Sequence, residues 1–452
     1  MIIQSKAGLM YSQLRTQRGK MALVLAGGGL SGAMYEIGAL RAIDDILTDR
    51  TVNDFDIYIG TSAGAIVGSL LANGATPETM LQGLSGDLPG IRPIQRRDLF
   101  HLNLQDVLKL GIKLPGIMLG AWTHYLRYIR DITLFDLLWS TSEALPTGLY
   151  DSLALEAYMR EVINNYGGTN DFTRLHQQLY IIATDLDSGR RAVFGPDSNQ
   201  DVPISLAIAA STAVPLLYRP VRIADHDYLD GSVRGNASID LAIERGATLV
   251  IVINPLVPFD NSDHHSVPFI GPAGSYLSDK GLTGVASQVG RIQSHGGLIY
   301  HIKQLRKTHP EVDIVLIEPN RHDYQMTFSN IMRYSTRLLL AQHGFETVTL
   351  NLAENYNYYA TLLSRHGIAI TERLVAEELE AIQASHYEPA VTQRILERQP
   401  MPPKQRSAST VSESLTNLND VLNELDAILR DWPARQAVDE TIGARPPARS
   451  QE

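Results

Sequence analysis

The chain has 452 residues, of which 44% are hydrophobic, and its formal net charge at pH 7 is -10. This length exceeds one typical hydrophobic core, so we expect one large domain with additions or two domains. The absence of cysteine excludes disulfides, zinc–thiolate sites and a cysteine nucleophile, while the acidic charge balance argues against a nucleic-acid partner.

The first predicted strand, Met21–Leu25, leads into a glycine-rich loop and then into a helical pattern. Gly27, Gly29 and Gly32 satisfy the G-x-G-x-x-G pattern of dinucleotide sites, but the second strand does not end in an acidic residue for a ribose. Successive backbone N–H groups in such a loop form an anion-binding nest that also suits a tetrahedral oxyanion. A tight turn without a ligand is the simpler alternative. We predict an oxyanion hole made of Gly27, Gly28, Gly29 and Leu30.

The second predicted strand, Phe55–Ile59, runs into a G-x-S-x-G sequence centred on Ser62 and then into an apolar helical segment. In this motif a strand turns sharply into a helix, the serine takes a strained conformation, and the glycines remove side chains that would clash. The following helix points its N-terminus at the serine, which favours a developing negative charge there. We therefore predict that Ser62 is a catalytic nucleophile. The other positions of this elbow are Gly60, Thr61, Ala63 and Gly64.

An insertion at about 95–145 is rich in apolar and aromatic residues, including Trp122 and Tyr125, and is interrupted by glycine and proline. It is too short and broken to cross a bilayer. A helical cap over the site and a surface that dips into lipid are two interpretations of it. Ordinary core packing is the more common role of such segments.

Further strands are predicted at Gln178–Asp185, 248–253 and 313–317, with a helix at 204–209 between the first two. Strands that alternate with helices imply a mostly parallel sheet. We therefore expect an α/β fold with a three-layer α/β/α core and functional residues at the carboxyl ends of its strands.

A third motif lies far downstream, where Asp230 stands on a tight turn after Tyr228 and Leu229 and before Gly231 and Ser232. A serine hydroxyl needs a base to remove its proton, and a partly buried aspartate within hydrogen-bond reach can serve. The alternative is a histidine base, as in α/β-hydrolases, where the catalytic residues follow one another along the chain in the order Ser, Asp or Glu, and His. His226 precedes Asp230, and His295 and His301 have no distinctive sequence context, so we favour the aspartate.

In this order, the glycine-rich loop, G-T-S-A-G and D-G-S resemble the patatin-like phospholipase family, over roughly residues 20–255. The resemblance implies a Ser-Asp dyad that hydrolyses acyl esters of lipids, without a catalytic histidine, a metal or a cofactor. It assigns Ser62 as nucleophile and Asp230 as general base. Family members commonly carry Arg or Lys where this chain has Ser31, and Ala or Gly where it has Ser232.

We expect a phospholipase A-like esterase whose partners are a phospholipid or other acyl lipid and, transiently, a membrane or micelle surface. A lipid acyltransferase using the same acyl-enzyme and a lipid-binding pseudoenzyme are the alternatives, and a nucleotide-binding oxidoreductase is a third. The first ten residues lack the apolar core of a signal peptide, and no stretch is long enough to span a membrane. We therefore expect a cytoplasmic protein that associates with membranes peripherally.

The expected organisation is an N-terminal extension over 1–19, a patatin-like catalytic domain over 20–258, a mainly helical extension over 259–396 and a low-complexity tail over 397–452. The extension should hold a loop with His264-His265, and we expect no metal there because the sequence offers no third ligand nearby. It should also contain helical segments at 287–305 and 332–363. The tail is expected to be largely disordered except for an amphipathic helix at 411–430. This helix would carry an apolar seam of Val411, Leu415, Leu418, Leu422, Leu425 and Leu429. The seam could dock onto the catalytic domain, pair with a second copy of the chain or bind a partner helix.

Overall fold

The computed structural model of the chain describes residues 19–103, 116, 146–262, 276–328, 334–371, 373–386 and 388–398. The chain divides into two compact units, Met1–Pro400 and Met401–Glu452, and all described residues belong to the first. Most of the predicted insertion, the His264-His265 pair and the predicted helix 411–430 lie outside the described residues.

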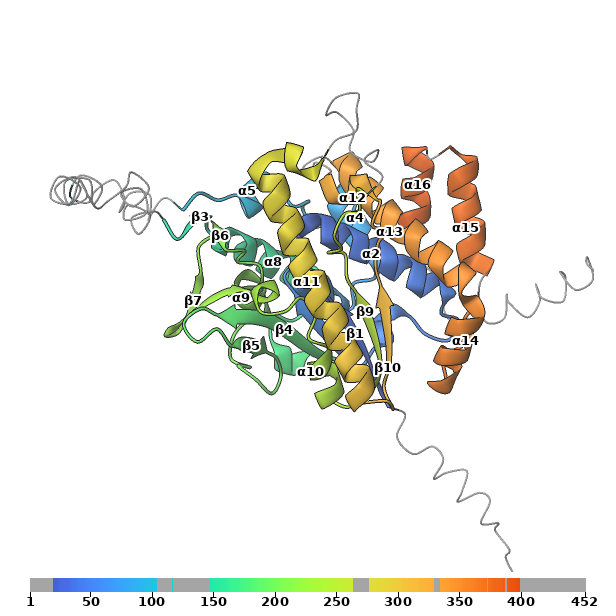
Figure 1. Ribbon diagram of the computed structural model, residues 1–452, viewed down its shortest axis with the longest axis horizontal. Coiled ribbons are helices and arrows are strands. Elements are labelled where there is room, and N and C mark those ends of the chain that lie inside the picture. The colour runs from blue at the N-terminus through green and yellow to red at the C-terminus, as the bar shows by residue number, and fades with distance from the viewer. Residues whose placement is uncertain are drawn as a thin grey trace, which may run out of the picture. The chain divides into compact units, whose positions relative to one another are not determined.

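One sheet organises the described part of the chain, and it is mixed but mostly parallel, as predicted (Figure 1). Five strands run parallel, and they occupy the sheet in the order β10 (Asp313–Ile317), β9 (Ala247–Ile253), β1 (Lys20–Leu25), β2 (Ile57–Thr61) and β4 (Gln178–Asp185). Beyond β4 the pairing is antiparallel, with β8 (His226–Asp230), β7 (Val221–Ile223) and β5 (Arg191–Phe194). A separate two-stranded sheet pairs β3 (Gly148–Tyr150) with β6 (Leu216–Tyr218).

Alternate residues of the central strands belong to two different cores, because successive side chains of a strand point to opposite faces. In β1, Leu23 and Leu25 pack in the larger core, whereas Ala22 and Val24 pack in the smaller one. Both faces of the sheet are therefore covered, which explains why these strands read as continuous apolar runs.

Helices lie on both faces of the sheet and complete the predicted three layers (Figure 1). The larger core is shared by α2 (Gly29–Ile46), α3 (Ala63–Ala72), α4 (Pro77–Ser85), α8 (Leu153–Asn165), α9 (Ile204–Ser211) and α13 (Tyr334–Glu354). The smaller core is covered by α10 (Ile239–Glu244) and α11 (Gly281–Thr308), and α11 crosses in front of β1 and β9 in Figure 1. The other described helices are α5 (Arg96–Leu99), α12 (Tyr324–Phe328), α14 (Tyr356–Arg365), α15 (Arg373–Ala384) and α16 (Pro389–Leu396), with 3₁₀ turns η1 (Val52–Asp54), η2 (Phe172–Arg174), η3 (Gly231–Val233) and η4 (Leu277–Lys280).

Two helices of the C-terminal part differ from the predicted ones. The predicted helix 332–363 is two helices, α13 and α14, which meet at Asn355, the N-cap of α14. The Asn355 side chain makes no capping hydrogen bond to α14, and its Nδ2 donates instead to the Asn351 carbonyl in the last turn of α13 at 3.0 Å. Helix α11 starts six residues before the predicted 287, over a mostly exposed stretch with two glycines, Gly281 and Gly284, whose low helix propensity weakens the helical pattern in the sequence.

The C-terminal part is packed tightly onto the N-terminal part. β10 extends the sheet beside β9, and α13 runs along α2 with glycines at the crossing. A side chain at Gly38 would overlap the backbone of Ala341, and one at Gly344 would overlap the backbone of Tyr35. Glycine on both helices therefore permits an approach that any other residue would prevent.

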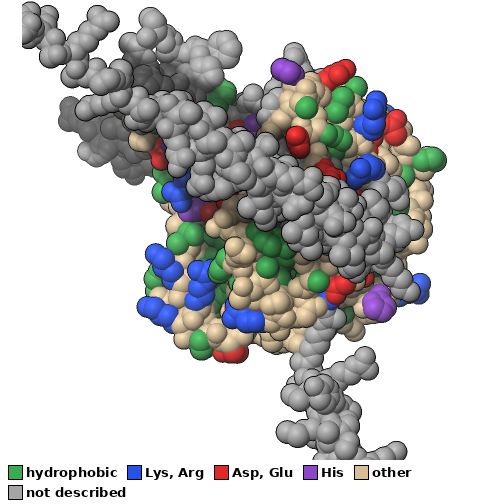
Figure 2. Space-filling view, turned by 90° about the vertical axis from the view of Figure 1, so that its right-hand side faces the viewer, with side chains coloured by type: hydrophobic (Ala, Val, Ile, Leu, Met, Phe, Trp, Pro, Cys, Tyr) green, Lys and Arg blue, Asp and Glu red, His purple; other side chains and the backbone are tan. Residues whose placement is uncertain are grey.

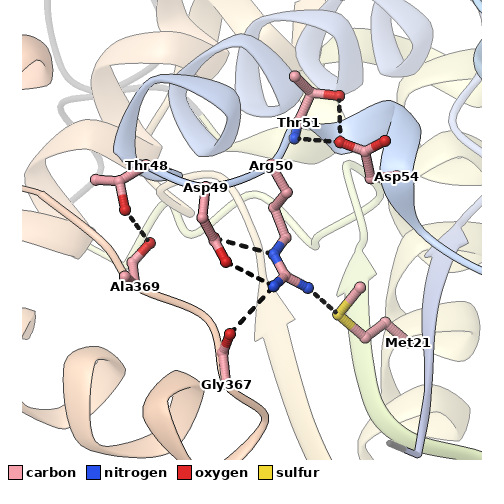
Figure 3. Close-up of polar contacts among 8 residues, drawn as sticks. All are labelled: Met21, Thr48, Asp49, Arg50, Thr51, Asp54, Gly367 and Ala369. Carbon is pink, nitrogen blue, oxygen red and sulfur yellow. Dashed lines mark hydrogen bonds and ion pairs between the residues drawn. The ribbon is translucent and has the colours of Figure 1, made fainter. Parts of the chain in front are cut away.

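A set of polar contacts, drawn in Figure 3, holds the end of α2 to residues 367–369. The Arg50 guanidinium pairs with the adjacent Asp49 carboxylate and donates to the Gly367 carbonyl at 3.1 Å. Thr48 Oγ1 donates to the Ala369 carbonyl at 3.1 Å. The segment after α14 is thus bound by hydrogen bonds to the N-terminal part of the fold.

On the face shown in Figure 2, several basic side chains of described residues gather toward the lower left, while the visible acidic ones are scattered. The net charge of -10 is therefore not gathered into one acidic field on that face. Among the described residues, none of the helices combines the length and the apolar character needed to cross a bilayer.

Candidate active site

Ser62 lies at the sharp connection between β2, which ends at Thr61, and α3, which begins at Ala63. Its backbone has φ 54° and ψ -117°, a conformation that costs about 1–3 kcal/mol for a residue with a side chain. The flanking glycines make the turn possible: a side chain at Gly60 would overlap the backbone of Gly64, and one at Gly64 would overlap the Leu25 carbonyl. The elbow predicted from the sequence is present with this strained geometry.

The backbone N–H of Ser62 donates to Ser211 Oγ at 2.8 Å, and Ser211 Oγ donates to the Ile182 carbonyl at 2.6 Å. Ser211 ends α9 and is buried, so it ties the elbow to β4. The sequence analysis assigned no role to this serine, because its short A-A-S-T segment has no signal apart from its apolar helix.

Asp230 is the last residue of β8 and is 1% exposed. Its N–H donates to the Ala213 carbonyl at 2.9 Å, and its own carbonyl accepts from Thr184 Oγ1 at 3.0 Å. Its carboxylate Oδ1 accepts from the Ser232 N–H at 2.8 Å. Both backbone and carboxylate are therefore held in one orientation.

Burial raises the pKa of the Asp230 carboxyl above its ordinary value, and hydrogen bonding from Ser62 and Ser232 opposes the rise. The Ser62 hydroxyl is thus close enough to the carboxylate to affect its proton affinity. The second oxygen, Oδ2, is buried and has no donor at full hydrogen-bond geometry in the described part of the chain. The two oxygens of the carboxylate therefore differ, since Oδ1 is held by the Ser232 N–H and Oδ2 is not held by a donor of this kind.

The glycine loop meets the other two motifs at Gly27. A Cβ at this position would lie 3.3 Å from Ser62 Cβ and 3.4 Å from Ser232 Cβ, so the three sequence motifs converge here. The Gly27 N–H donates to Asn236 Oδ1 at 2.9 Å. Gly28 is the N-cap of α2, so the N–H groups that follow lie in its first turn, which a helix leaves without internal acceptors.

A buried polar chain leads away from the glycine loop. Asn236 Nδ2 donates to Asn254 Oδ1 at 2.8 Å, and Asn254 Nδ2 donates to Glu318 Oε1 at 2.7 Å. His295 of α11 lies 3.1 Å from the Glu318 carboxylate. The sequence analysis did not identify these residues, although Asn254 and Glu318 each follow a buried strand directly, which is a readable signal.

The three rival histidines lie in other environments. His226 pairs with Asp185 at 2.9 Å, His295 with Glu318, and His301 lies 4.0 Å from Asp240. No hydrogen bond or ion pair found among the described residues joins one of them to Ser62. Over the same residues, no group of three or more His, Asp or Glu side chains could hold a metal ion.

An apolar pocket of about 210 Å³, which we call the outer apolar pocket, opens beside Ser62. Its walls come from the glycine loop, α3 and the β6 region, and include Gly29, Phe100 and Leu217. A second, almost wholly apolar cavity of about 90 Å³, the inner apolar pocket, lies between α2, α3, α4 and α8. The two share three lining residues, namely Leu30, Ala33 and Ile66.

Comparison with known proteins gives a match over residues 23–243 to the family model described as patatin-like phospholipase. The chain is 22% identical over 242 residues to "Probable lipid hydrolase 463L" of Invertebrate iridescent virus 6, covering 54% of this chain and 70% of that one. It is 26% identical over 242 residues to "Intracellular phospholipase A2" of Caenorhabditis elegans, covering 51% of this chain but only 18% of that protein.

Two solved structures also resemble the chain. VipD from Legionella pneumophila is 14% identical with a TM-score of 0.35, over 92% of this chain and 77% of that one. The type III effector protein ExoU is 15% identical with a TM-score of 0.31, over 91% of this chain and 65% of that one.

Proposed function

Since the chain carries a patatin-like phospholipase domain over residues 23–243, we propose that it is a lipid acyl hydrolase that uses Ser62 as nucleophile and Asp230 as general base. The family match and the curated relatives named as a lipid hydrolase and a phospholipase support hydrolysis of lipid esters. The observation that carries the finer proposal is the buried Asp230 carboxylate beside the hydroxyl of a strained Ser62.

In the first step Ser62 Oγ attacks the ester carbonyl carbon, and its proton passes to Asp230 Oδ2. The raised pKa of this carboxyl supports the assignment, because a base works best when its proton affinity approaches the working pH. The carbonyl oxygen becomes an oxyanion that accepts hydrogen bonds from backbone N–H groups in the first turn of α2. We assign this role to Gly28, Gly29 and Leu30, while the Gly27 N–H stays with Asn236.

Collapse of the tetrahedral intermediate breaks the ester C–O bond, and the protonated Asp230 gives its proton to the departing alcohol. An acyl-enzyme on Ser62 remains, with the acyl chain in the outer apolar pocket and its end toward the inner one. Asp230 then takes a proton from water, and the water oxygen attacks the carbonyl carbon of the acyl-enzyme. The bond between this carbon and Ser62 Oγ breaks, Asp230 returns its proton to Ser62 Oγ, and the fatty acid leaves. The lipid reaches this site from a membrane or micelle surface, which the protein contacts transiently.

The test is hydrolysis of p-nitrophenyl butyrate and of mixed phospholipid vesicles by wild type, Ser62→Ala and Asp230→Asn. We expect turnover to fall by about 10⁴-fold or more in both variants, as when a member of a catalytic unit is removed. A fluorophosphonate should label wild type and not Ser62→Ala, which reports the nucleophile independently of turnover.

Two matched variants control for folding. Ser69→Ala removes a buried hydroxyl of the same helix α3, which donates to the Ile66 carbonyl, and Asp227→Asn removes a carboxylate of the same strand β8, which pairs with Arg222. Both should keep their activity. Activity that survives Asp230→Asn but not Ser62→Ala would assign the base to another residue. Wild type without turnover or labelling would favour a lipid-binding pseudoenzyme.

A further inference from the structure

A second hollow lies on the other side of the glycine loop, and we call it the polar cleft. It has a volume of about 760 Å³ and runs between the segment after Asp230, which includes Ser232, and helix α11. Gly28 forms part of its wall. The cleft is therefore adjacent to the oxyanion loop and to the segment that anchors the Asp230 carboxylate.

The charge of this cleft differs from that of the whole chain. Its described lining residues include Arg234, Arg291 and His301 but no Asp or Glu, although the chain carries a net charge of -10. The glycine loop adds no cation of its own, because position 31 is serine. A hollow with two arginines and no carboxylate attracts an anion.

Arg291 is the most informative of these residues, because its side chain is buried within the protein. The residue is 7% exposed, its Nη1 donates to the Val257 carbonyl at 3.1 Å, and its Nε is buried without an acceptor. No carboxylate pairs with it in the part of the chain that the structure describes. Ser294, one turn further along α11 and also in the cleft, has a buried hydroxyl without a partner.

A buried guanidinium without a counter-ion is costly, and burial lowers the pKa of Arg291 with no nearby carboxylate to offset the effect. Phosphate oxygens satisfy this arrangement, because they accept several N–H bonds at once and bring the compensating charge. We propose that the polar cleft is a phosphate-binding subsite in which Arg291, aided by Ser294 and Arg234, holds the phosphate group of a lipid substrate.

This inference rests on the proposed function for its source of phosphate, the lipid headgroup. In a glycerophospholipid, about five bonds separate the sn-2 ester carbonyl carbon from the phosphorus atom and about six separate the sn-1 carbonyl carbon from it, so the ester and the phosphate need neighbouring sites. Placing the ester at Ser62 and the phosphate in the polar cleft puts them on either side of the glycine loop, through Gly29 and Gly28 respectively.

The first experiment compares a phosphatidylcholine with the matching diacylglycerol in the same detergent micelles, because the pair differs only in the phosphate headgroup. We expect Arg291→Gln to raise the KM for phosphatidylcholine, relative to that for diacylglycerol, by about tenfold or more, with little change in kcat. Arg291→Lys should restore part of the difference. Arg306→Gln is the matched control, since Arg306 lies on the same helix and also donates to a carbonyl, that of Ile314, but is outside the cleft.

A binding measurement does not depend on turnover. Glycerophosphocholine and inorganic phosphate should each be titrated against wild type and Arg291→Gln, with thermal unfolding as readout. Stabilisation of wild type that is lost in Arg291→Gln supports the subsite, and stronger stabilisation by glycerophosphocholine identifies the headgroup rather than free phosphate as its ligand. Stabilisation without any ester hydrolysis would retain the subsite and reject the proposed function.

An unchanged KM ratio together with no stabilisation by either phosphate compound would overturn the inference. If Arg291→Gln does not fold, Ser294→Ala and Arg234→Gln carry the same tests, because each removes a phosphate donor while leaving Arg291 in place. An unchanged KM ratio and undiminished binding in both would also reject it.

Discussion

The outer apolar pocket and the polar cleft both border on the glycine loop, but they differ in the polarity of their other lining side chains. The first is lined mainly by apolar side chains and contains Ser62, whereas the second is bordered by Arg291 and other polar groups. The pocket is built from residues inside the matched segment 23–243, while the far wall of the cleft is α11, which lies outside that segment. If our two proposals hold, the residues that carry the reaction lie within the matched segment, whereas part of the phosphate subsite lies in α11, outside it.

Gly28→Ala should have the largest effect on activity, because it disturbs the glycine loop, which borders both hollows. A methyl group at this position would lie 2.6 Å from Pro255 Cγ and 2.9 Å from Gly32 Cα, so the loop must shift. We expect kcat to fall by about 10²–10³-fold for neutral and phosphate-bearing esters alike, as when an oxyanion donor is lost. Steady-state kinetics on both ester classes measure this, and an effect limited to one class would show that the loop serves only one side.

Asn236→Ala should have the next largest effect. It removes the acceptor of the Gly27 N–H and the donor to Asn254, which leaves buried polar groups unpaired beside the loop. We expect kcat to fall by about 10–100-fold for both ester classes with little change in KM. Asn199→Ala is the control, since that amide is exposed and donates to the Val193 carbonyl. A loss of activity of equal size in the control would remove the special role of Asn236.

Ala33→Leu should separate the roles of the two hollows, because Ala33 lines the apolar pockets and not the polar cleft. Ala33 lines both the outer and the inner apolar pocket, so a larger side chain narrows the passage between them. We expect activity on decanoyl relative to butanoyl p-nitrophenyl esters to fall by about tenfold, the value of one or two buried methylene groups. Phosphatidylcholine and diacylglycerol of equal chain length should lose activity equally. A loss confined to the phospholipid would contradict the division between the two hollows.

The smallest expected effect concerns the stability of the fold around the buried Asp230 carboxyl. The pKa of Asp230 is raised in the folded state, so the wild type loses folding stability as pH rises through that raised pKa, whereas Asp230→Asn does not. Asp230→Asn should therefore unfold at a higher temperature than wild type at neutral pH, and the difference in unfolding temperature should close in acid below the ordinary pKa of aspartate. Thermal unfolding across pH 3–8 checks this. A gap that widens in acid would mean that the carboxylate stabilises the fold.

The sequence predicted the central strands well because each is an apolar run buried on both faces. The expected ranges 178–185 and 313–317 coincide with β4 and β10. It did not predict β5, β7 and β8, which are short and carry polar residues, so their antiparallel pairing emerges only from contacts across the sheet. Helix α11 was placed but shortened, because its first turns contain glycine.

In the candidate site, too, local sequence patterns predicted some residues, while others depend on contacts between distant parts of the chain. Ser62, Asp230 and the glycine loop were predicted because short motifs place chemistry beside turn residues, and the structure brings the three motifs together at Gly27. Their roles in catalysis remain predictions. Ser211, Asn236 and Arg291 could not be predicted, because each acts through a partner distant in sequence or through burial.

The hydrogen bond from Gly27 to Asn236 also has a consequence for synthesis on the ribosome. Its two partners are 209 positions apart, and Asn236 is itself held by Asn254 at the end of β9. At about 5–20 residues per second, the loop emerges roughly 10–40 seconds before the side chain that fixes it. A nascent chain therefore exposes Ser62 long before the Gly27 N–H finds its acceptor, so the esterase activity that we propose should appear only after β9 and the segment behind it have left the ribosome.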